Sequence, residues 1–425
     1  MAVLLGCIAD DFTGGTDLAG MLVKSGMKTI QLIGVPTEPA PDDVDAIVIA
    51  LKSRTNPAAD AVEESLRALQ WLKQQGCRQH YFKYCSTFDS TSKGNIGPVT
   101  EALMKALNAK FTIACPAFPA NKRSIYKGHL FVGDELLSES GMLNHPLTPM
   151  TDSNLVRVLQ AQVNGKVGLT DYTFVKGGAS LIDQRFADLQ KEWYQFSIVD
   201  ALSDADLYSI GAACADLSLV TGGSGIAIGL PENFRKKGLL KITVDANKLG
   251  AVRGLKAVIA GSCSVATQEQ VRVMKEKSPA YFVDPISLVD GKDVVAEALA
   301  WASENIAKGP LLIYATSAPD VVKSIQERVG ADKAGEMVEH ALAQIAQGLI
   351  KLGVGQLIVA GGETSGAVVK ALGISGLRIG PEIAPGVPWT KAIFEQSDKE
   401  PLVLALKSGN FGGPQFFNEA WDYIQ

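Results

Sequence analysis

A regular alternation of short apolar runs with longer segments of helical periodicity constrains the fold most strongly. Each run is bounded by Gly, Pro, Asp or Lys, and the segment after Pro57 places Val62, Leu66, Leu69 and Leu72 at helical spacing. The runs predict strands at 3–9, 29–34, 46–51, 80–85, 111–115, 196–199, 217–220, 257–260, 281–283, 311–314 and 357–360. Strands that alternate with helices are joined by right-handed crossovers in a parallel sheet. We therefore expect an α/β fold in which mainly parallel sheets are flanked by helices.

The length of the chain predicts two domains. A single hydrophobic core rarely grows beyond roughly 250–300 residues, and this chain has 425. The segment GLPENFRKKG at 229–238 interrupts the alternation with glycine, proline and charge. We predict domains at 1–245 and 246–425, with an active site in the cleft between them.

Composition excludes several classes of function. A formal charge of −5 and a pI near 5.6 argue against a nucleic-acid groove, which usually needs a surplus of basic residues. No apolar run approaches the roughly 20 residues that a membrane span requires. The six cysteines are scattered without C-x-x-C spacing, which is typical of reduced thiols in a cytoplasmic protein. We expect small molecules as partners, with neither nucleic acid nor membrane, and a homodimer is compatible with the sequence.

Two adjacent carboxylates lie in the stretch IADDFTGGTDLAG at 8–20. Asp10 and Asp11 follow the first predicted strand, and Gly14 and Gly15 lead into a helix. Ligands of doubly wound sheets bind beyond the carboxyl ends of the strands, so the pair faces the expected ligand corner. Paired acids there can hold sugar hydroxyls, bind Mg²⁺ or act as a general base. Capping of the helix by Asp11 or Thr13 is the ordinary alternative.

Basic and hydroxyl side chains follow later strands of the first half. Arg54, in SRTNP at 53–57, suits bidentate capture of a carboxylate or phosphate, although taken alone it is more simply a surface arginine. The segment FKYCSTFDSTSKGNIGP at 82–98 combines Lys83, Lys93 and several hydroxyls with glycines that let a ligand approach the backbone. This concentration of donors indicates a small, oxygen-rich anion, and an ordinary serine-rich loop is the alternative.

A further polar segment, NKRSIYKGHLFVG at 121–133, is expected to form a loop. It brings Arg123, Tyr126, Lys127 and His129 together. His129 is a candidate base or hydroxyl ligand, although a single histidine is more often structural.

Three strand–helix junctions in the second half point to phosphate binding. In LIVAGGETSGAVVKALG, Gly361 and Gly362 let main-chain N–H groups reach a phosphate at the start of a helix. Glu363 is the unexpected member, because a carboxylate repels phosphates unless a metal or ribose intervenes. VIAGSCSVATQEQV and LALKSGNFGGP add junctions at Ser262 and Gly409. Neither a G-x-G-x-x-G fingerprint nor a Walker A motif is present.

Taken together and in order, these motifs resemble the four-carbon acid sugar kinases over essentially the whole chain. IADDFTGGTD is similar to the family's N-terminal signature, and DSTSKGN resembles its D-S-T-x-[KR]-G-N. GGSGIA, GGETSGAV, EIAPGVPW and LKSGNFG follow in the family order. Within the family, KYCSTFDST most resembles the 3-oxo-tetronate kinases. The doubled element leaves open whether Cys85-Ser86-Thr87 or Asp89-Ser90-Thr91 contacts the substrate.

The resemblance implies an acid-sugar domain followed by an ATP domain, and phosphoryl transfer from ATP to a terminal 4-hydroxyl group. Mg²⁺ is then expected to bridge the β- and γ-phosphates, mostly through waters. Arg54 and Lys83 would hold the carboxylate and keto end of the substrate. Asp10 or Asp11 would orient the hydroxyl group, and one of them could accept its proton.

The other expected roles follow from the same resemblance. Ser90, Lys93 and Arg123 would complete the sugar pocket or neutralise the moving phosphoryl group. The residues expected to hold ATP are Ser262, Gly361, Gly362, Glu363, Thr364 and Gly409. A threonate or erythronate kinase is the alternative within the class. A dinucleotide-dependent dehydrogenase and a non-catalytic acid-sugar sensor are the alternatives outside it.

Overall fold

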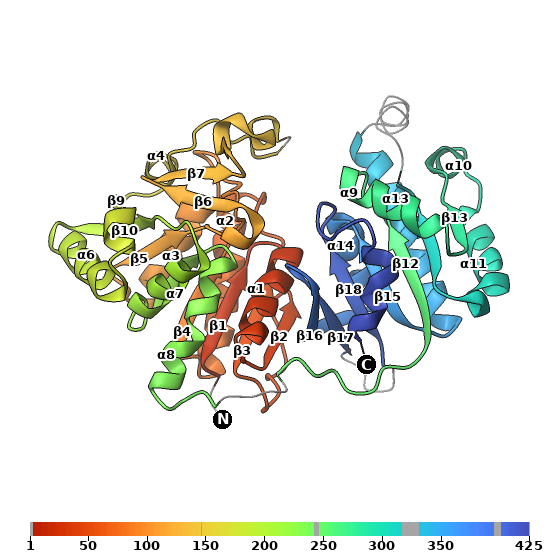
Figure 1. Cartoon of the computed structure of the whole chain (residues 1–425), viewed down its shortest axis with the longest axis horizontal. Helices are drawn as coiled ribbons and strands as arrows, with labels where there is room; N and C mark the ends of the chain where they lie inside the picture. Colours follow the sequence, from red (N-terminus) through yellow and green to blue (C-terminus); the bar gives the residue numbers. More distant parts are fainter. Residues whose placement is uncertain (1–2, 146, 242–245, 317–330, 395–400, 425) are drawn as a thin grey trace. The chain divides into compact units, whose positions relative to one another are not determined.

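Parallel strand pairing dominates both halves of the chain, as the alternating pattern predicts. The computed structural model describes residues 3–145, 147–241, 246–316, 331–394 and 401–424. The chain divides into two units, Met1–Ala246 and Asn247–Gln425 (Figure 1). Within each unit the strands run mainly parallel and are flanked by helices, so the predicted α/β class is confirmed.

The first unit contains an entirely parallel sheet in the order β2-β3-β1-β4-β11-β5-β10-β9. Its strands are β1 (Leu5–Ala9), β2 (Thr29–Ile33), β3 (Ala46–Ala50), β4 (Gln79–Lys83), β5 (Thr112–Cys115), β9 (Lys166–Thr170), β10 (Tyr194–Val199) and β11 (Leu219–Gly222). From β1 the chain passes to β2 and β3 on one side and then crosses to β4 on the other. The direction of winding therefore reverses between β1 and β4, where doubly wound sheets bind their ligands.

Helices cover the sheet of the first unit (Figure 1). They are α1 (Phe12–Lys24), α2 (Ala58–Gln74), α3 (Ile96–Leu107), α4 (Leu155–Gln160), α5 (Tyr172–Val175), α6 (Ala179–Lys191), α7 (Asp204–Ala213) and α8 (Pro231–Lys236). Pro57 directly precedes α2, where the proline ring disrupts no helical hydrogen bond. α1 buries Leu18 and Leu22, and β1 is buried along its whole length. Segment 229–238, expected as an interruption, contains α8.

Residues 121–133 form a β-hairpin, so the expectation of a loop there was wrong. β6 (Arg123–Tyr126) pairs antiparallel with β7 (His129–Val132), which pairs with β8 (Glu135–Leu136). The turn residues Lys127 and Gly128 have φ of 51° and 75°, as a tight two-residue hairpin turn requires. Asp200, after β10, accepts hydrogen bonds from both turn N–H groups, at 2.7 and 2.8 Å. This carboxylate therefore fixes the hairpin.

The second unit has the strand order β13-β14-β12-β15-β18-β17-β16. β12 (Leu255–Ala260), β13 (Ala280–Phe282), β14 (Leu311–Tyr314), β15 (Val354–Ala360) and β18 (Val403–Lys407) run parallel, whereas β16 (Ile374–Ala384) and β17 (Val387–Phe394) form an antiparallel hairpin. The helices are α9 (Val265–Lys275), α10 (Pro285–Val289), α11 (Val294–Asn305), α13 (Ala331–Lys351), α14 (Gly362–Leu372) and α15 (Phe416–Glu419).

Two tryptophans lie in the core of the second unit, one of them in strand β17 of the hairpin. The rings of Trp389 and Trp421 lie 5.5 Å apart, and Trp389 Nε1 donates to the carbonyl of Ala420 at 2.8 Å. Short 3₁₀ turns, η1 (Pro119–Asn121), η2 (Leu137–Glu139), η3 (Gly141–Asn144), η4 (Gly225–Gly229), η5 (Ile306–Lys308) and η6 (Ala420–Tyr423), complete the described structure. Among the helices described, none is both long enough and apolar enough to cross a bilayer.

Candidate functional site

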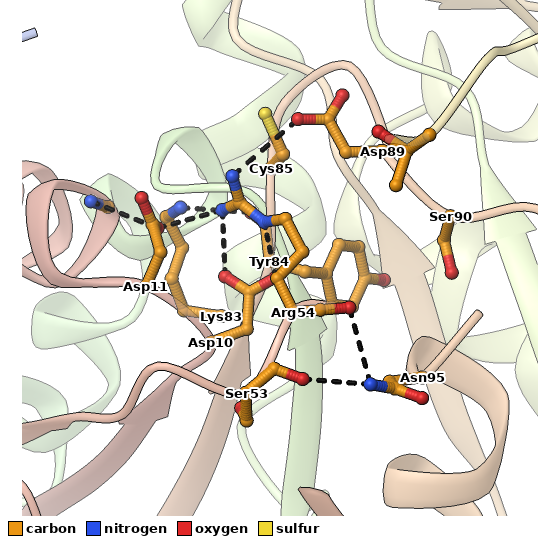
Figure 2. A network of polar contacts seen from close by, with 12 residues as sticks. Asp10, Asp11, Ser53, Arg54, Lys83, Tyr84, Cys85, Asp89, Ser90 and Asn95 are labelled. Atoms are coloured by element: carbon orange, nitrogen blue, oxygen red, sulfur yellow. Dashed lines mark hydrogen bonds and ion pairs between the residues drawn. The ribbon is translucent and has the colours of Figure 1, made fainter. Parts of the chain in front are cut away.

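Polar side chains converge at the carboxyl ends of β1, β3 and β4, beside the reversal point of the first sheet. Asp10 and Asp11 come directly after β1, Ser53 and Arg54 follow β3, and Lys83 ends β4. Figure 2 shows the carboxylates of Asp10 and Asp11 beside the Arg54 guanidinium group. The register explains the convergence, because Ala9 lies opposite both Ala50 and Lys83 in the paired strands. Four of the residues that the sequence singled out are thus brought together.

The Arg54 guanidinium group binds three carboxylates. Its Nε and Nη2 atoms each donate to Asp10 at 2.9 Å, in a two-pronged ion pair, and Nη2 also donates to Asp11 at 2.8 Å. Nη1 lies 3.6 Å from Asp89 Oδ2. The donors on Nε and Nη2 are therefore engaged at hydrogen-bond distance, whereas Nη1 makes only the longer contact with Asp89.

Asp10 and Asp11 differ in accessibility and in pKa. Burial raises the pKa of Asp10 despite its ion pair with Arg54, and its side chain is 7% exposed. Burial also acts to raise the pKa of Asp11, but Arg54, Lys83, Thr13 and the Gly14 N–H group together lower it. The Asp11 side chain is 27% exposed. Asp11 is consequently the more acidic and the more accessible of the two carboxylates.

Asp11 also caps α1, so the capping interpretation holds together with the functional one. Its Oδ1 atom accepts from the Gly14 N–H group at 3.1 Å, and Oδ2 accepts from the Thr13 hydroxyl at 3.0 Å. A Cβ at Gly14 would lie 2.6 Å from Lys83 Nζ. The glycine therefore allows the ammonium group of Lys83, which is 3% exposed, to approach the start of the helix.

Asn95 is a site residue that sequence reasoning missed, although it ends the quoted motif DSTSKGN. Its buried side-chain amide donates to the carbonyls of Ser53 at 2.8 Å, Arg54 at 3.2 Å and Asn56 at 2.8 Å. One amide from the start of α3 thus shapes the backbone that carries Arg54 (Figure 2). The glycine and asparagine of the motif were the available signal.

Asp89 is the second missed residue. It lies in a tight turn in which Phe88 and Asp89 have φ of 65° and 41°, in the left-handed region that side chains rarely adopt. The Thr87 hydroxyl donates to Asp89 Oδ1 at 2.7 Å, while Oδ2 faces Arg54. The doubled element therefore has one structural function, because its first triplet orients the aspartate of the second.

Ser90 lies next to this cluster and is buried. Its hydroxyl accepts from the Gln162 amide at 3.0 Å, and Gln162 also accepts from the Gly97 N–H group at 2.8 Å. A small cavity beside Ser90 is lined by Asp10, Ser53, Arg54, Phe82, Asp89, Ser90, Asn95, Ile96 and Val99. The polar side of that cavity is formed by the residues already described.

Lys93, Arg123 and His129 lie outside the network around Arg54. Lys93 is exposed, and its main-chain N–H group donates to Thr91 Oγ1 at 3.3 Å. The Arg123 guanidinium group donates to the Asn121 carbonyl, and His129 Nδ1 lies 2.9 Å from the Lys127 carbonyl. These contacts of Arg123 and His129 lie at the β6–β7 hairpin, and His129 Nε2 also lies 3.4 Å from Asn154 Nδ2. Their predicted roles remain predictions.

In the second unit the three predicted junctions meet at the carboxyl ends of β12, β15 and β18. The Ser262 N–H group donates to the Ala360 carbonyl at 3.2 Å, and the Gly361 N–H group donates to the Lys407 carbonyl at 2.8 Å. A Cβ at Gly409 would collide with the Ser262 hydroxyl. Gly361 has a φ of 129°, which a side chain would strain. Ser262, Gly361 and Gly409 therefore share one corner of this unit.

Two helices begin at that corner. α9 starts after Ser264, whose hydroxyl accepts from the Thr267 N–H group at 3.3 Å, and α14 starts after Gly361. Gly362 and Glu363 are exposed in the first turn of α14, while Thr364 is buried. The positive ends of two helices beside closely packed glycines form a fitting cradle for phosphate groups. The residues present therefore fit a nucleotide.

The described residues fit a nucleotide better than they fit a protein-bound metal ion. Among the residues that the structure describes, no group of three or more His, Cys, Asp or Glu side chains could hold a metal. The three carboxylates near Arg54 are engaged by its guanidinium group. A Mg²⁺ ion would thus depend on phosphate oxygens and water, as this ion commonly does, and we assign it no protein ligand.

Comparisons with known proteins divide the chain in the same way. A sugar-binding N-terminal domain family matches residues 5–230, and a nucleotide-binding C-terminal domain family matches 257–417. A relative from Burkholderia multivorans, named 3-oxo-tetronate kinase, is 59% identical over 98% of this chain and 96% of its own length. A relative of the same name from Haemophilus influenzae is 48% identical over 98% and 99%.

Solved structures agree with these matches. A Haemophilus influenzae protein aligns with a TM-score of 0.83 and 48% identity, over 99% of this chain and 100% of the other. A Salmonella typhimurium LT2 protein aligns with a TM-score of 0.90 and 43% identity, over 99% of each chain. The sugar-binding match includes the Arg54 cluster, and the nucleotide-binding match includes all three glycine junctions.

Proposed function

We propose, since the chain belongs to the four-carbon acid sugar kinase family, that it is an ATP-dependent kinase that phosphorylates the terminal 4-hydroxyl group of 3-oxo-tetronate. The relatives of that name are similar along almost the whole chain, which supports this substrate over threonate or erythronate. The observation that most supports ATP as the phosphoryl donor is that Ser262, Gly361 and Gly409 lie together at the start of two helices. Phosphoryl transfer needs positioning and charge stabilisation more than covalent chemistry.

The acid would bind at the Arg54 cluster. Arg54 offers Nη1, and Lys83 offers its ammonium group, to the carboxylate and keto end of the substrate. The 4-hydroxyl oxygen attacks the γ-phosphorus of ATP, its proton passes to a carboxylate, and ADP leaves. We assign the proton to Asp11, because its side chain is 27% exposed whereas that of Asp10 is 7% exposed.

The remaining roles are extensions of this proposal. Ser90 would contribute to the sugar pocket, and Lys93, Arg123 and His129 would complete it or neutralise the moving phosphoryl group. ATP would be held by Ser262, Gly361, Gly362, Glu363, Thr364 and Gly409, and Mg²⁺ would neutralise charge on its phosphates. Direct transfer requires the γ-phosphate and the hydroxyl to meet. The cleft between the domains, a cytoplasmic location and a homodimer belong to the proposal as well.

A panel of four-carbon acids tests the substrate. ADP formation is measured with 3-oxo-tetronate, threonate and erythronate at equal concentrations, with ATP and Mg²⁺ present. The proposal expects the highest kcat/KM with 3-oxo-tetronate. Preference for threonate or erythronate would change the substrate while leaving the kinase class intact. Binding of acid without any ADP formation would instead support a sensor, and nicotinamide absorbance changes without ADP would support a dehydrogenase.

A further inference from the structure

Lys407 is a fully buried lysine at the end of β18, beside the proposed phosphate corner. Its ammonium group donates to Thr267 Oγ1 at 3.1 Å and to the carbonyls of Ser408 at 3.0 Å and Gly409 at 2.8 Å. Thr267 Oγ1 also donates to the Gly409 carbonyl at 2.8 Å. The lysine thus fixes the turn after β18 through two main-chain carbonyls and links that turn to the first turn of α9 through Thr267.

All three hydrogen-bond partners of this ammonium group are neutral oxygens. Within the described ranges, no carboxylate lies within 4.0 Å of Nζ. Burial lowers the pKa of Lys407 to about 7, and no charged side chain contributes to that shift. A buried cation without a counter-ion is costly, so it loses its proton easily.

Charged residues on the neighbouring elements form ion pairs of their own, are exposed, or lie at the far end of β18. On α9, Arg272 forms exposed ion pairs with Glu269 at 2.8 Å and Glu276 at 2.6 Å. On α14, Glu363 and Lys370 are exposed. On β17, Lys391 pairs in register with Val403, at the opposite end of β18 from Lys407.

We infer that Lys407 is a positioning residue of the nucleotide site, whose positive charge is balanced only when nucleotide phosphates bind at the glycine corner. The inference rests on the proposed function and extends it to a residue outside the expected phosphate contacts. Its geometry supports it, because the Lys407 carbonyl accepts from the Gly361 N–H group while the ammonium group holds Gly409. Phosphates bound at that corner would therefore interact with the buried Lys407 ammonium group through protein of low dielectric constant.

Nucleotide binding must then take up a proton near neutral pH. With a pKa near 7, Lys407 is mostly neutral at pH 8 in the free protein, and bound phosphates favour its charged form. Affinity is therefore greatest below pH 7 and weakens as the pH rises through the pKa of the free protein. If the complex keeps the proton throughout, Kd for ADP rises on the order of 20-fold between pH 6.5 and 8.5.

Calorimetry of ADP binding to the full-length protein, with Mg²⁺, tests the inference. Titrations at pH 8 in two buffers of different ionisation enthalpy count the protons taken up, and the expected number approaches one. Lys407→Met keeps the length of the side chain without its charge, so uptake should vanish and Kd should rise at pH 6.5. Lys370→Met removes an exposed lysine of α14 and should leave uptake and Kd unchanged.

The wild-type pH series decides the matter even if Lys407→Met does not fold. A Kd that stays constant from pH 6.5 to 8.5, with no buffer-dependent heat, would overturn the role of Lys407 while leaving a nucleotide site in place. Proton uptake that persists in a folded Lys407→Met variant would also overturn it. The absence of ADP binding at every pH would refute the proposed function itself, and the inference with it.

Discussion

Replacing Asp11 with asparagine separates the chemical function of this residue from its structural one. Asparagine is as good a helix cap as aspartate, so the bond to the Gly14 N–H group can survive the substitution. What is lost is the negative charge beside Arg54 and the ability to accept a proton. We expect kcat to fall by about 10² or more, which corresponds to roughly 2.7 kcal/mol of transition-state stabilisation.

The same substitution at Asp10 should behave differently. Asp10 binds Arg54 through both oxygens and is 7% exposed, so Asp10→Asn leaves buried donors poorly matched. We expect the free energy of unfolding to fall by about 1–3 kcal/mol, with a raised KM for the acid. Asp60→Asn, at an exposed carboxylate of α2, is the control for charge removal and should change neither quantity.

The assays are steady-state ADP formation and urea unfolding at pH 7.5. Near-wild-type kcat in Asp11→Asn would remove this residue from the role of base. A loss of about 10² in kcat for Asp10→Asn, with unchanged unfolding, would transfer the role to Asp10 and refute the argument from side-chain exposure.

Three further substitutions test the two sites separately. Arg54→Ala should raise the KM for the acid and lower the thermal unfolding temperature, because three carboxylates lose their shared cation; an unchanged KM would place the substrate carboxylate elsewhere. Asn95→Ala should raise the same KM by about tenfold, since the carbonyls around Arg54 lose a common donor worth about 1.5 kcal/mol, and equal kinetics would deny it a positioning role. Gly409→Ala should weaken ADP binding in calorimetry at least tenfold while acid binding is kept, because the added carbon collides with Ser262; intact ADP affinity would move the phosphates away from this turn.

The sequence predicted the parallel strands well because a strand buried on both faces is read as an apolar run. β9 was not predicted, because Lys166 and Gly168 interrupt its apolar sequence. The β16–β17 hairpin escaped because it is antiparallel and carries charged residues such as Arg378 and Lys391 within its strands. Short-range patterns therefore predict most of the central strands and lose those with a mixed composition, and β18 (Val403–Lys407) was recognised only as the apolar run before a predicted junction.

The same reasoning explains which site residues could be found. Asp10, Arg54 and Lys83 lie at or directly after the ends of predicted strands, where the topology alone places a ligand. Asp89 and Asn95 depend on a loop that turns back through left-handed backbone conformations, and no spacing rule predicts which side chain such a loop returns to Arg54. Lys407 was part of a quoted motif, but its significance depends on burial, which only the packed strands reveal.

The two units use different groups to bind anions. The pH dependence of binding in each unit follows from the pKa values of those groups. In the first unit, Arg54 and Lys83 help to keep the pKa of Asp11 below its usual value, so this carboxylate stays ionised from mildly acidic to alkaline pH. In the second unit, backbone N–H groups are joined by one buried cation whose proton is released near pH 7. We therefore expect the KM for ATP to rise between pH 6.5 and 8.5 as Lys407 loses its proton, because nucleotide binding weakens. Saturating ATP would then restore the rate, whereas raising the acid concentration alone would not.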